Sequence, residues 1–306
     1  MTTERLIAAL QNPALYDHPT TEFQIIETHI SWVILTGNFA YKIKKSVNLG
    51  FLDFSSLDQR CWYCHQEVRA NQALSPEIYL AVIPITGSVD NPQFCGRGEI
   101  IEYAILMREF NQENLFTSLL KRHALTSDLI DDIAILLAKF HAKANTAVPS
   151  PTLGSPEQIL QPVKQNFDQI RELLANNVGA NIDQINRLES WSYQQWEILK
   201  PVFAQRKEQG YIRECHGDIH LGNITLINHR PVIFDCIEFN DELRWIDVIS
   251  DVAFLAIDLI DNQYEQYAHQ LLSYYLEHTS DYFGLKVLVF YQVYRAIVRA
   301  KVNLFK

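Results

Sequence analysis

Short apolar runs rich in β-branched and aromatic residues dominate the first third of the chain. They lie at residues 23–29, 32–35, 39–44, 79–85 and 99–107. Such runs, bounded by polar turn residues, predict β-strands. Two stretches with helical spacing, 3–11 and 57–74, interrupt these runs, and Ser55 or Ser56 is suited to cap the second of them. This third of the chain is therefore predicted to form a sheet accompanied by two helices.

The hydrophobic pattern changes to a helical period beyond about residue 125. The run Ser127–Ala144 follows a polar start with apolar residues at positions 129, 130, 133, 136, 137 and 140. Further helices are predicted over residues 156–175, 183–209, 245–261 and 285–302. A segment rich in Pro, Ser and Thr, residues 145–156, predicts a loop between the first two helices. The rest of the chain is thus predicted to be mainly helical.

One stretch inside this helical part, Tyr211–Asp241, has the pattern of a hairpin instead. Two β-type runs, 223–227 and 231–234, flank the turn-prone residues Asn228-His229-Arg230. A polar loop, residues 216–222, precedes the first run, and Asp235 directly follows the second. The sequence therefore predicts a hairpin that carries functional groups at its open end.

Three polar side chains in this hairpin have the chemistry of a phosphoryl-transfer site. Asn223 follows Asp218 by five residues, and Asp235 follows Asn223 by twelve. Transfer from Mg-ATP needs one group that orients a substrate hydroxyl and accepts its proton, and oxygen ligands that hold magnesium. A single Asp or Asn often serves only to cap a turn. The combination at this spacing favours the functional interpretation.

The residues of this loop also resemble a known signature. His216-Gly217-Asp218-Ile219-His220-Leu221-Gly222-Asn223, followed by Ile233-Phe234-Asp235, is similar to the H-G-D-x-H-x-x-N plus I-x-D pattern of small-molecule kinases of the aminoglycoside phosphotransferase-like and choline-kinase-like family. The resemblance implies that Asp218 is the catalytic base and that Asn223 and Asp235 are magnesium ligands. It implies that His216 and His220 shape the loop, with His220 close to the transferred phosphate.

Two neighbouring segments resemble one branch of this family more closely. They are Glu238-Phe239-Asn240-Asp241 and Asp251-Val252-Ala253-Phe254, and in that branch a kinase-like half is often fused to a C-terminal P-loop domain. The chain contains no G-x-x-x-x-G-K-[ST] string, and whether a P-loop partner acts in trans stays open. The resemblance further implies that Asp251 braces the catalytic loop through hydrogen bonds. For His141, at the end of a predicted helix, a structural role is favoured.

The fold implied by the resemblance is a two-lobed, protein-kinase-like α+β fold. Residues 1–108 would form an N-terminal nucleotide-binding lobe with a small antiparallel sheet, and residues 109–306 a mainly helical catalytic and substrate lobe. The third predicted strand places Lys42 and Lys44 on the same face, because strand residues two apart point the same way. The resemblance implies that one lysine contacts the α- and β-phosphates and that Glu67 positions it. Lys42 is the choice, with Lys44 as the alternative.

The remaining nucleotide contacts are less specific. The first turn, residues 28–31, contains no glycine, although a backbone that cradles phosphate usually needs one. The hydroxyl groups of Thr28 and Ser31 could take its place. Met107 and Glu109 lie at the expected hinge between lobes, where backbone groups would bind adenine; this placement follows from the resemblance and the order of elements alone.

Composition narrows the class of protein further. The 306 residues are 48% hydrophobic, which suits a folded domain with a substantial core. A formal charge of −10 argues against a nucleic-acid partner. Five scattered cysteines predict reduced thiols, and neither a signal peptide nor a membrane-spanning run is visible. The protein is therefore expected to be soluble and cytoplasmic; its oligomeric state is not readable.

The predicted function is ATP- and Mg2+-dependent phosphorylation of a hydroxyl group on a small molecule. The alternatives are a nucleotide-binding regulatory module or pseudokinase, and a nucleotidyl transferase on the same scaffold. A protein kinase is disfavoured because Asp235 is followed by Cys-Ile-Glu rather than Phe-Gly. The acceptor is not identified by the sequence. Acidic Glu238, Asp241 and Glu242 would suit a cationic acceptor, and equally a solvated surface.

Overall fold

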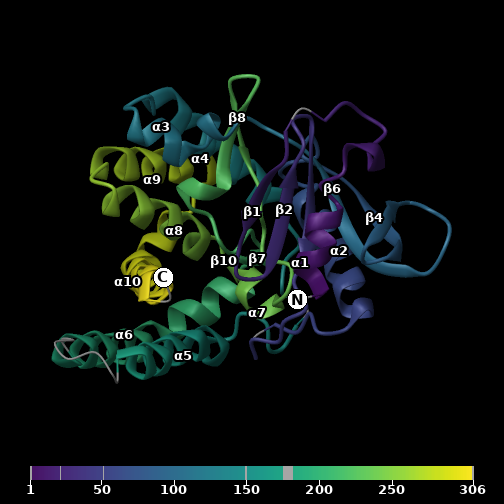
Figure 1. Ribbon diagram of the computed structural model, residues 1–306. Coiled ribbons are helices and arrows are strands. Elements are labelled where there is room, and N and C mark those ends of the chain that lie inside the picture. Colours follow the sequence, from purple (N-terminus) through teal and green to yellow (C-terminus); the bar gives the residue numbers. More distant parts are fainter. Residues whose placement is uncertain (1, 21, 51, 149, 175–181, 305–306) are drawn as a thin grey trace. The chain divides into compact units, whose positions relative to one another are not determined.

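The computed structural model describes residues 2–20, 22–50, 52–148, 150–174 and 182–304, and the chain within it divides into two compact units. The first unit contains Met1–Ser118 and Thr225–Asn240, and the second contains Leu119–Ile224 and Asp241–Lys306. The two units differ in their main elements (Figure 1). The first contains a sheet with accompanying helices, and the second is mainly helical, which confirms the predicted α+β class.

The first unit is organised around a six-stranded antiparallel sheet. Its strands are β1 (Gln24–Glu27), β2 (Ser31–Leu35), β3 (Phe39–Lys44), β4 (Tyr79–Ser88), β5 (Asn91–Phe94) and β6 (Ile100–Arg108). They pair in the order β1-β2-β3-β6-β4-β5. The first three strands and β6 lie within two residues of their predicted limits. Strand β5 was not predicted, because Pro92 and the surrounding turn residues hide its pattern; it pairs only with β4, as expected for a proline at a sheet edge.

The two faces of this sheet pack against different helices. Helix α1 (Thr2–Ala9) contributes Leu6 and Ile7 to the core on one face, together with Tyr41 and Ile43 of β3. Helix α2 (Leu57–Asn71) contributes Cys64 and other apolar residues to the core on the opposite face. The alternation predicted for β3 is therefore confirmed, and its lysines lie on the side of α2. Two 3-10 turns, η1 (Pro13–Leu15) and η2 (Gln112–Asn114), complete the N-terminal part.

Helix α2 begins where the sequence predicted. Ser56 is its N-cap and accepts a hydrogen bond from the backbone N–H of Gln59, whose side chain is bonded in return to the Ser56 backbone N–H. This capping box satisfies two amides that the first helical turn leaves unpaired. The start of the helix is thereby fixed, and with it the position of Glu67 three turns later.

The predicted hairpin is present as β8 (Ile224–Ile227) and β9 (Arg230–Ile233). Asn228 and His229 connect the strands in the left-handed region, with φ of 51° and 63°. Two consecutive left-handed residues match the twist of a tight hairpin. Apart from Ile224, the hairpin belongs to the first unit, and Val232 packs in the core on the α2 side.

Helices form most of the second unit. Helices α9 (Glu265–Thr279) and α10 (Leu285–Leu304) pack against α8 (Val248–Asp261), and α4 (Ser127–Lys143) packs against α9, which was not predicted. Helices α5 (Pro156–Leu174) and α6 (Ile182–Glu208) pack against each other and against α10. The short elements are α3 (Phe116–Lys121), η3 (Leu221–Asn223), α7 (Asp241–Arg244) and η4 (Tyr282–Gly284). Helix α8 is buried over most of its surface, so the other helices are built around it. The predicted end of α5 at Ala175 lies outside the described residues.

One predicted helix begins later than expected. Residues Trp245–Asp247, taken as the first turn of a helix, form strand β10, which pairs antiparallel with β7 (Ile212–Glu214). Asp247 then caps α8 by accepting a hydrogen bond from the Ile249 backbone N–H. The cap explains the boundary, because an N-cap residue has extended rather than helical backbone geometry. No helix within the described ranges is both long enough and apolar enough to span a lipid bilayer.

Candidate functional site

The loop His216–Gly222, which carries Asp218, is anchored to helix α8 by a buried carboxylate. Asp251 accepts hydrogen bonds from the backbone N–H groups of His216 at 3.0 Å and Gly217 at 2.9 Å. Arg295 of α10 donates to the Gly217 carbonyl at 3.0 Å. Burial by itself would raise the pKa of Asp251, but the hydrogen bond from His141 and the nearby positive groups lower it. Asp251 is thus an ionised brace, as predicted.

A second carboxylate of α8 holds the other end of the loop. Asp258 accepts a hydrogen bond from the Leu221 backbone N–H at 2.8 Å and pairs with Arg299 at 2.7 Å. Asp258 follows Asp251 by seven residues, about two helical turns, so both point from the same side of α8. Asp218 lies between the two anchor points. Sequence reasoning did not assign Asp258 to the loop.

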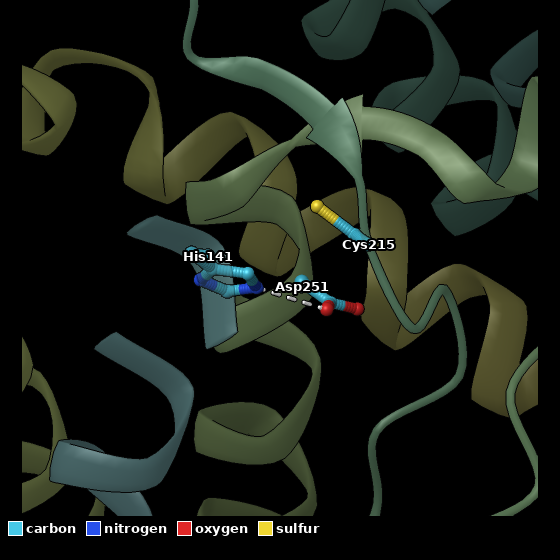
Figure 2. Close-up of side chains that lie close together, drawn as sticks. All are labelled: His141, Cys215 and Asp251. Atoms are coloured by element: carbon cyan, nitrogen blue, oxygen red, sulfur yellow. Dashed lines mark hydrogen bonds and ion pairs between the residues drawn. The ribbon is translucent and has the colours of Figure 1, made fainter. Parts of the chain in front are cut away.

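His141 and Cys215 lie beside Asp251 in a buried cluster (Figure 2). The nitrogen, sulfur and oxygen atoms of these three side chains lie within 4.8 Å of one another, a spacing that could hold a metal ion. Each side chain nevertheless already has a protein partner. His141 contacts Asp251 at 3.2 Å and the Tyr275 hydroxyl at 2.8 Å, and the Cys215 thiol donates to the Ile246 carbonyl at 3.5 Å. The cluster is therefore a hydrogen-bonded support for the loop, and the predicted structural role of His141 is confirmed.

Asp218 lies at the accessible part of the braced loop, with 40% of its side chain exposed. The Nε2 atom of His220 lies 3.6 Å from its carboxylate. His220 Nδ1 accepts a hydrogen bond from the Gly222 backbone N–H, so a neutral His220 carries its proton on Nε2, facing Asp218. Burial acts to raise the pKa of Asp218, but His220, His216 and Arg295 lower it below its ordinary value. Asp218 is thus an ionised group, able to accept a proton.

Asn223 is tied to the same loop. Its side-chain nitrogen donates to the Asp218 carbonyl at 3.0 Å. This bond assigns the amide orientation and leaves the side-chain oxygen as the atom for an external partner. Asn223, Asp218 and the histidines all belong to the second unit, whereas the other predicted site residues belong to the first.

In the first unit, Lys42 of β3 contacts two carboxylates. Its Nζ atom lies 2.6 Å from Asp235 and 2.7 Å from Glu67 of α2. Burial would lower the pKa of Lys42, but Asp235 and Glu67 outweigh it and hold the pKa well above its ordinary value. Lys42 is 12% exposed, whereas Lys44 is fully buried. Of the two lysines, only Lys42 presents any surface to a ligand.

Asp235 is held in an unusual backbone conformation. Its φ is 67°, in the left-handed region that few residues other than Gly, Asn and Asp adopt readily. The hydroxyl of Tyr79 accepts a hydrogen bond from the Asp235 backbone N–H at 3.2 Å, and Asn71 accepts one from the Cys236 backbone N–H at 3.0 Å. The Asp235 side chain remains 42% exposed. The backbone is therefore fixed, while part of the side chain is accessible to solvent.

Thr28 and Ser31 form the turn between β1 and β2. The Thr28 hydroxyl accepts from the Ser31 backbone N–H at 2.9 Å and donates to the Ser31 carbonyl, so that it closes its own turn. Ser31 is fully buried. The Thr28 hydroxyl thus stabilises the turn between β1 and β2, whereas the buried Ser31 hydroxyl has no hydrogen-bond partner among the described residues. Contact of these hydroxyl groups with phosphate stays a prediction.

At the expected hinge, Met107 is buried in the core on the α2 side. The backbone N–H of Glu109 donates to the Asn38 carbonyl at 3.1 Å. Its carboxylate accepts hydrogen bonds from the backbone N–H groups of Thr36 and Gly37. Glu109 therefore fixes the β2–β3 turn. Contact of this segment with adenine stays a prediction, and Glu109 would have to contribute through its carbonyl group.

Sequence reasoning missed several partners of these residues. Tyr79 and Asn71, which hold the Asp235 segment, come from strand and helix positions with no distinguishing pattern. Glu238 was noted only as an acidic neighbour, yet it is buried and bonded to Lys44. A carboxylate three residues after Asp235 in an apolar segment was a usable signal, because buried charges need partners.

Comparisons with known proteins identify a protein family and relatives of this chain. The model of the phosphotransferase enzyme family matches residues 63–288. An uncharacterized protein of Mycobacterium tuberculosis is 31% identical over 289 residues, which cover 94% of this chain and 56% of that protein. A protein of Mycobacterium bovis matches to the same extent. The chain therefore spans about half the length of the curated relatives it matches.

Solved structures share the fold at low identity. A glucosamine kinase in complex with glucosamine, ADP and inorganic phosphate is similar with a TM-score of 0.50 and 14% identity, covering 99% of this chain and 81% of that chain. The streptomycin–ATP–APH(2″)-IIa ternary complex has a TM-score of 0.50 and 15% identity, with 96% and 88% covered. These likenesses confirm the predicted protein-kinase-like fold.

Proposed function

The chain belongs to the phosphotransferase enzyme family, and we propose that it transfers the γ-phosphate of ATP to a hydroxyl group of a small molecule in the presence of Mg2+. The observation that carries this proposal is the contact set of Lys42. A lysine held by Glu67 and by the exposed carboxylate of Asp235 is the arrangement that phosphate binding next to a metal requires. The ionised Asp218 on its braced loop supplies the proton acceptor.

The chain's residues suit magnesium. Mg2+ prefers oxygen ligands, and Asp235 offers an exposed carboxylate while Asn223 offers its amide oxygen. When bound, the ion would neutralise charge on the phosphates. Asp235 and Asn223 are the proposed ligands, each held by hydrogen bonds within its own unit.

The other residues act on the substrates. Lys42, positioned by Glu67, would bind the α- and β-phosphates, while Asp218 would orient the acceptor hydroxyl and take its proton. His220, with Nε2 directed at Asp218, helps to keep that carboxylate ionised. In this proposal residues 1–108 serve mainly nucleotide binding, residues 109–306 mainly catalysis and acceptor binding, and Thr225–Asn240 returns to the first unit with Asp235.

The acceptor is proposed only as a hydroxylated small molecule. The acidic residues that suggested a cationic acceptor have partners within the protein. Glu238 pairs with Lys44 at 2.5 Å, and Asp241 pairs with Arg244 at 2.5 Å. These carboxylates therefore give no support to a cation-binding acceptor site.

The first test is magnesium-dependent nucleotide binding. We expect ADP to raise the melting temperature of the protein when Mg2+ is present, because a ligand that binds only the folded state stabilises it. Asp235→Asn is the variant of choice, since Asn tolerates the left-handed backbone of this position. It should keep the ligand-free melting temperature and lose the magnesium-dependent part of the shift. A shift in the variant equal to that of the wild type would contradict the assignment.

Transfer is tested separately with labelled ATP. Transfer of label from the γ-phosphate to a hydroxylated acceptor supports the kinase. Transfer of label from the α-phosphate would instead identify a nucleotidyl transferase. Magnesium-dependent binding with no transfer to any acceptor in a broad set would favour the regulatory module.

A further inference from the structure

Lys44 is a fully buried cation that no step of the proposed reaction uses. Its Nζ atom lies 2.6 Å from Glu67 and 2.5 Å from Glu238, and it lies over the ring of Phe54 at 4.8 Å. The side chains of Lys44 and Glu67 are 0% exposed, and that of Glu238 is 5% exposed. Burying a charged group is unfavourable, and an ion pair offsets that cost only with close contacts. The buried ammonium of Lys44, two residues from the proposed phosphate-binding Lys42, therefore requires a physical explanation.

Lys44 is part of a chain of alternating charges. Asp235 contacts Lys42, Lys42 contacts Glu67, Glu67 contacts Lys44 and Lys44 contacts Glu238. Asp235 and Glu238 are three residues apart on the same segment, so the backbone closes the chain into a ring. Strand β3, helix α2 and the segment after β9 each contribute side chains to this ring, and all of them lie in the first unit.

The ring explains how the Asp235 segment is held at its far end. Tyr79 and Asn71 fix the backbone at Asp235 and Cys236. The pair formed by Glu238 and Lys44 ties the same segment to β3, two residues from Lys42. Because Glu67 contacts both lysines, Lys44 also offsets part of the negative charge of Glu67. Glu67 therefore attracts Lys42 less strongly, and the Lys42 ammonium stays directed at Asp235 as well.

We propose that Lys44 is a positioning residue, which acts through Glu238 and Glu67 to set the Asp235 carboxylate and the Lys42 ammonium at the spacing that a metal-bound nucleotide needs. This inference rests on the proposed function. Lys44 itself touches neither ligand, since it has no exposed surface. The competing interpretation is a structural ion pair that contributes to stability and nothing else.

The test compares Lys44→Met, Glu238→Gln and the double variant. Each is measured for its melting temperature without ligand, and for its affinity for ADP by calorimetry with and without Mg2+. Lys44→Met leaves Glu238 buried without its partner, so it should lower the melting temperature. The double variant removes both charges and should recover most of that loss. The magnesium-dependent gain in ADP affinity should fall by about tenfold or more in Lys44→Met and stay low in the double variant, as when a group supporting a metal ligand is removed.

Lys45→Met is the matched control. Lys45 directly follows Lys44 and pairs with Glu27, whose side chain is 55% exposed. The same substitution there should leave the magnesium-dependent gain unchanged.

The outcomes separate the two proposals. If the magnesium-dependent gain in the double variant returns to the wild-type value together with the melting temperature, Lys44 is structural and the positioning role is wrong. Should Lys44→Met not fold, Glu238→Gln and the double variant decide in the same way. If wild-type protein shows no magnesium-dependent gain at all, the proposed function fails and the positioning role fails with it.

Discussion

The unit with the long helices holds a buried charge network centred on Arg206, and the unit with the sheet holds another, centred on Lys42 and Lys44. Arg206 donates two hydrogen bonds to Asp247 and two to Asp281, between 2.6 and 2.8 Å, and all three side chains are at most 1% exposed. Each network contains one more carboxylate than cations. They differ in what takes up the surplus negative charge.

Around Arg206 the surplus is satisfied by the backbone. Asp247 accepts a hydrogen bond from the Ile249 N–H at the start of α8, and Asp281 accepts one from the Gly284 N–H. The positive end of a helix favours such a carboxylate. In the lysine network the carboxylate at one end belongs to Asp235, whose side chain is 42% exposed. The first network is buried and satisfied within the protein, whereas the second ends in the partly exposed side chain that we propose as a metal ligand.

Removing the exposed end of the lysine network should have the largest effect. Asp235→Asn is expected to lower kcat by about 10³-fold or more, because charge stabilisation supplies most of the rate in phosphoryl transfer. Lys42→Met should lower kcat by roughly 10²-fold, since a bound metal still offsets part of the phosphate charge. Steady-state kinetics on both variants check this order. Equal losses, or the larger loss in Lys42→Met, would contradict the assigned roles.

Opening the Arg206 network should change stability instead. Arg206→Met leaves Asp247 and Asp281 buried without their cation, and we expect a loss of about 3–5 kcal/mol in the free energy of unfolding. Urea unfolding measures this loss. The kcat of the folded fraction, determined well below the melting temperature, should stay within about twofold of wild type. A large fall in kcat with little change in stability would show that this network, too, serves the reaction.

The smallest expected effect concerns Asp218, the proposed proton acceptor. His220 helps to lower the pKa of Asp218, and the base must be ionised to act, so activity is lost as the pH falls through that pKa. His220→Gln removes the imidazole that lowers the pKa of Asp218, so it should raise that pKa and move the acid limb of the kcat/KM profile to higher pH. The rate near pH 7.5 should change little, because Asp218 is ionised there in both proteins.

His278→Gln provides the control for that profile. His278 is an exposed histidine hydrogen-bonded to the Tyr274 carbonyl within its own helix, and its replacement should leave the acid limb in place. If the acid limb of the His220→Gln variant stays at the wild-type pH, His220 does not influence the pKa of Asp218.

The sequence predicted those parts of the molecule that local patterns encode. The alternation in β3 placed Lys42 and Lys44 on one face, and Ser55 or Ser56 was suited to cap α2. These features depend on residues close together in the chain. Their spacing and residue types were enough because strand and helix periodicity fix which side chains share a face. The brace formed by Asp251, 35 residues from His216, was implied by the family resemblance instead.

Contacts between distant segments were not predictable in this way. Lys44 is bonded to Glu238, 194 residues away, and its burial depends on how the sheet packs with α2 and the segment after β9. The strand Trp245–Asp247 was taken for helix because its partner β7 is more than thirty residues earlier. Arg295 donates to the carbonyl of Gly217, 78 residues away. Such partners are set by the folded arrangement rather than by periodicity.

The two carboxylates of α8 also bear on which changes this lineage can accumulate. Seven residues of helix separate Asp251 from Asp258 by about 10 Å, a length that the helix does not adjust. Between His216 and Leu221 the backbone must match that fixed separation, so adding or deleting one residue there detaches the loop from one anchor. The turn at Asn228 and His229 has no such double attachment and can vary in length. Natural variants of this chain should therefore carry insertions at the hairpin tip and keep the loop at constant length.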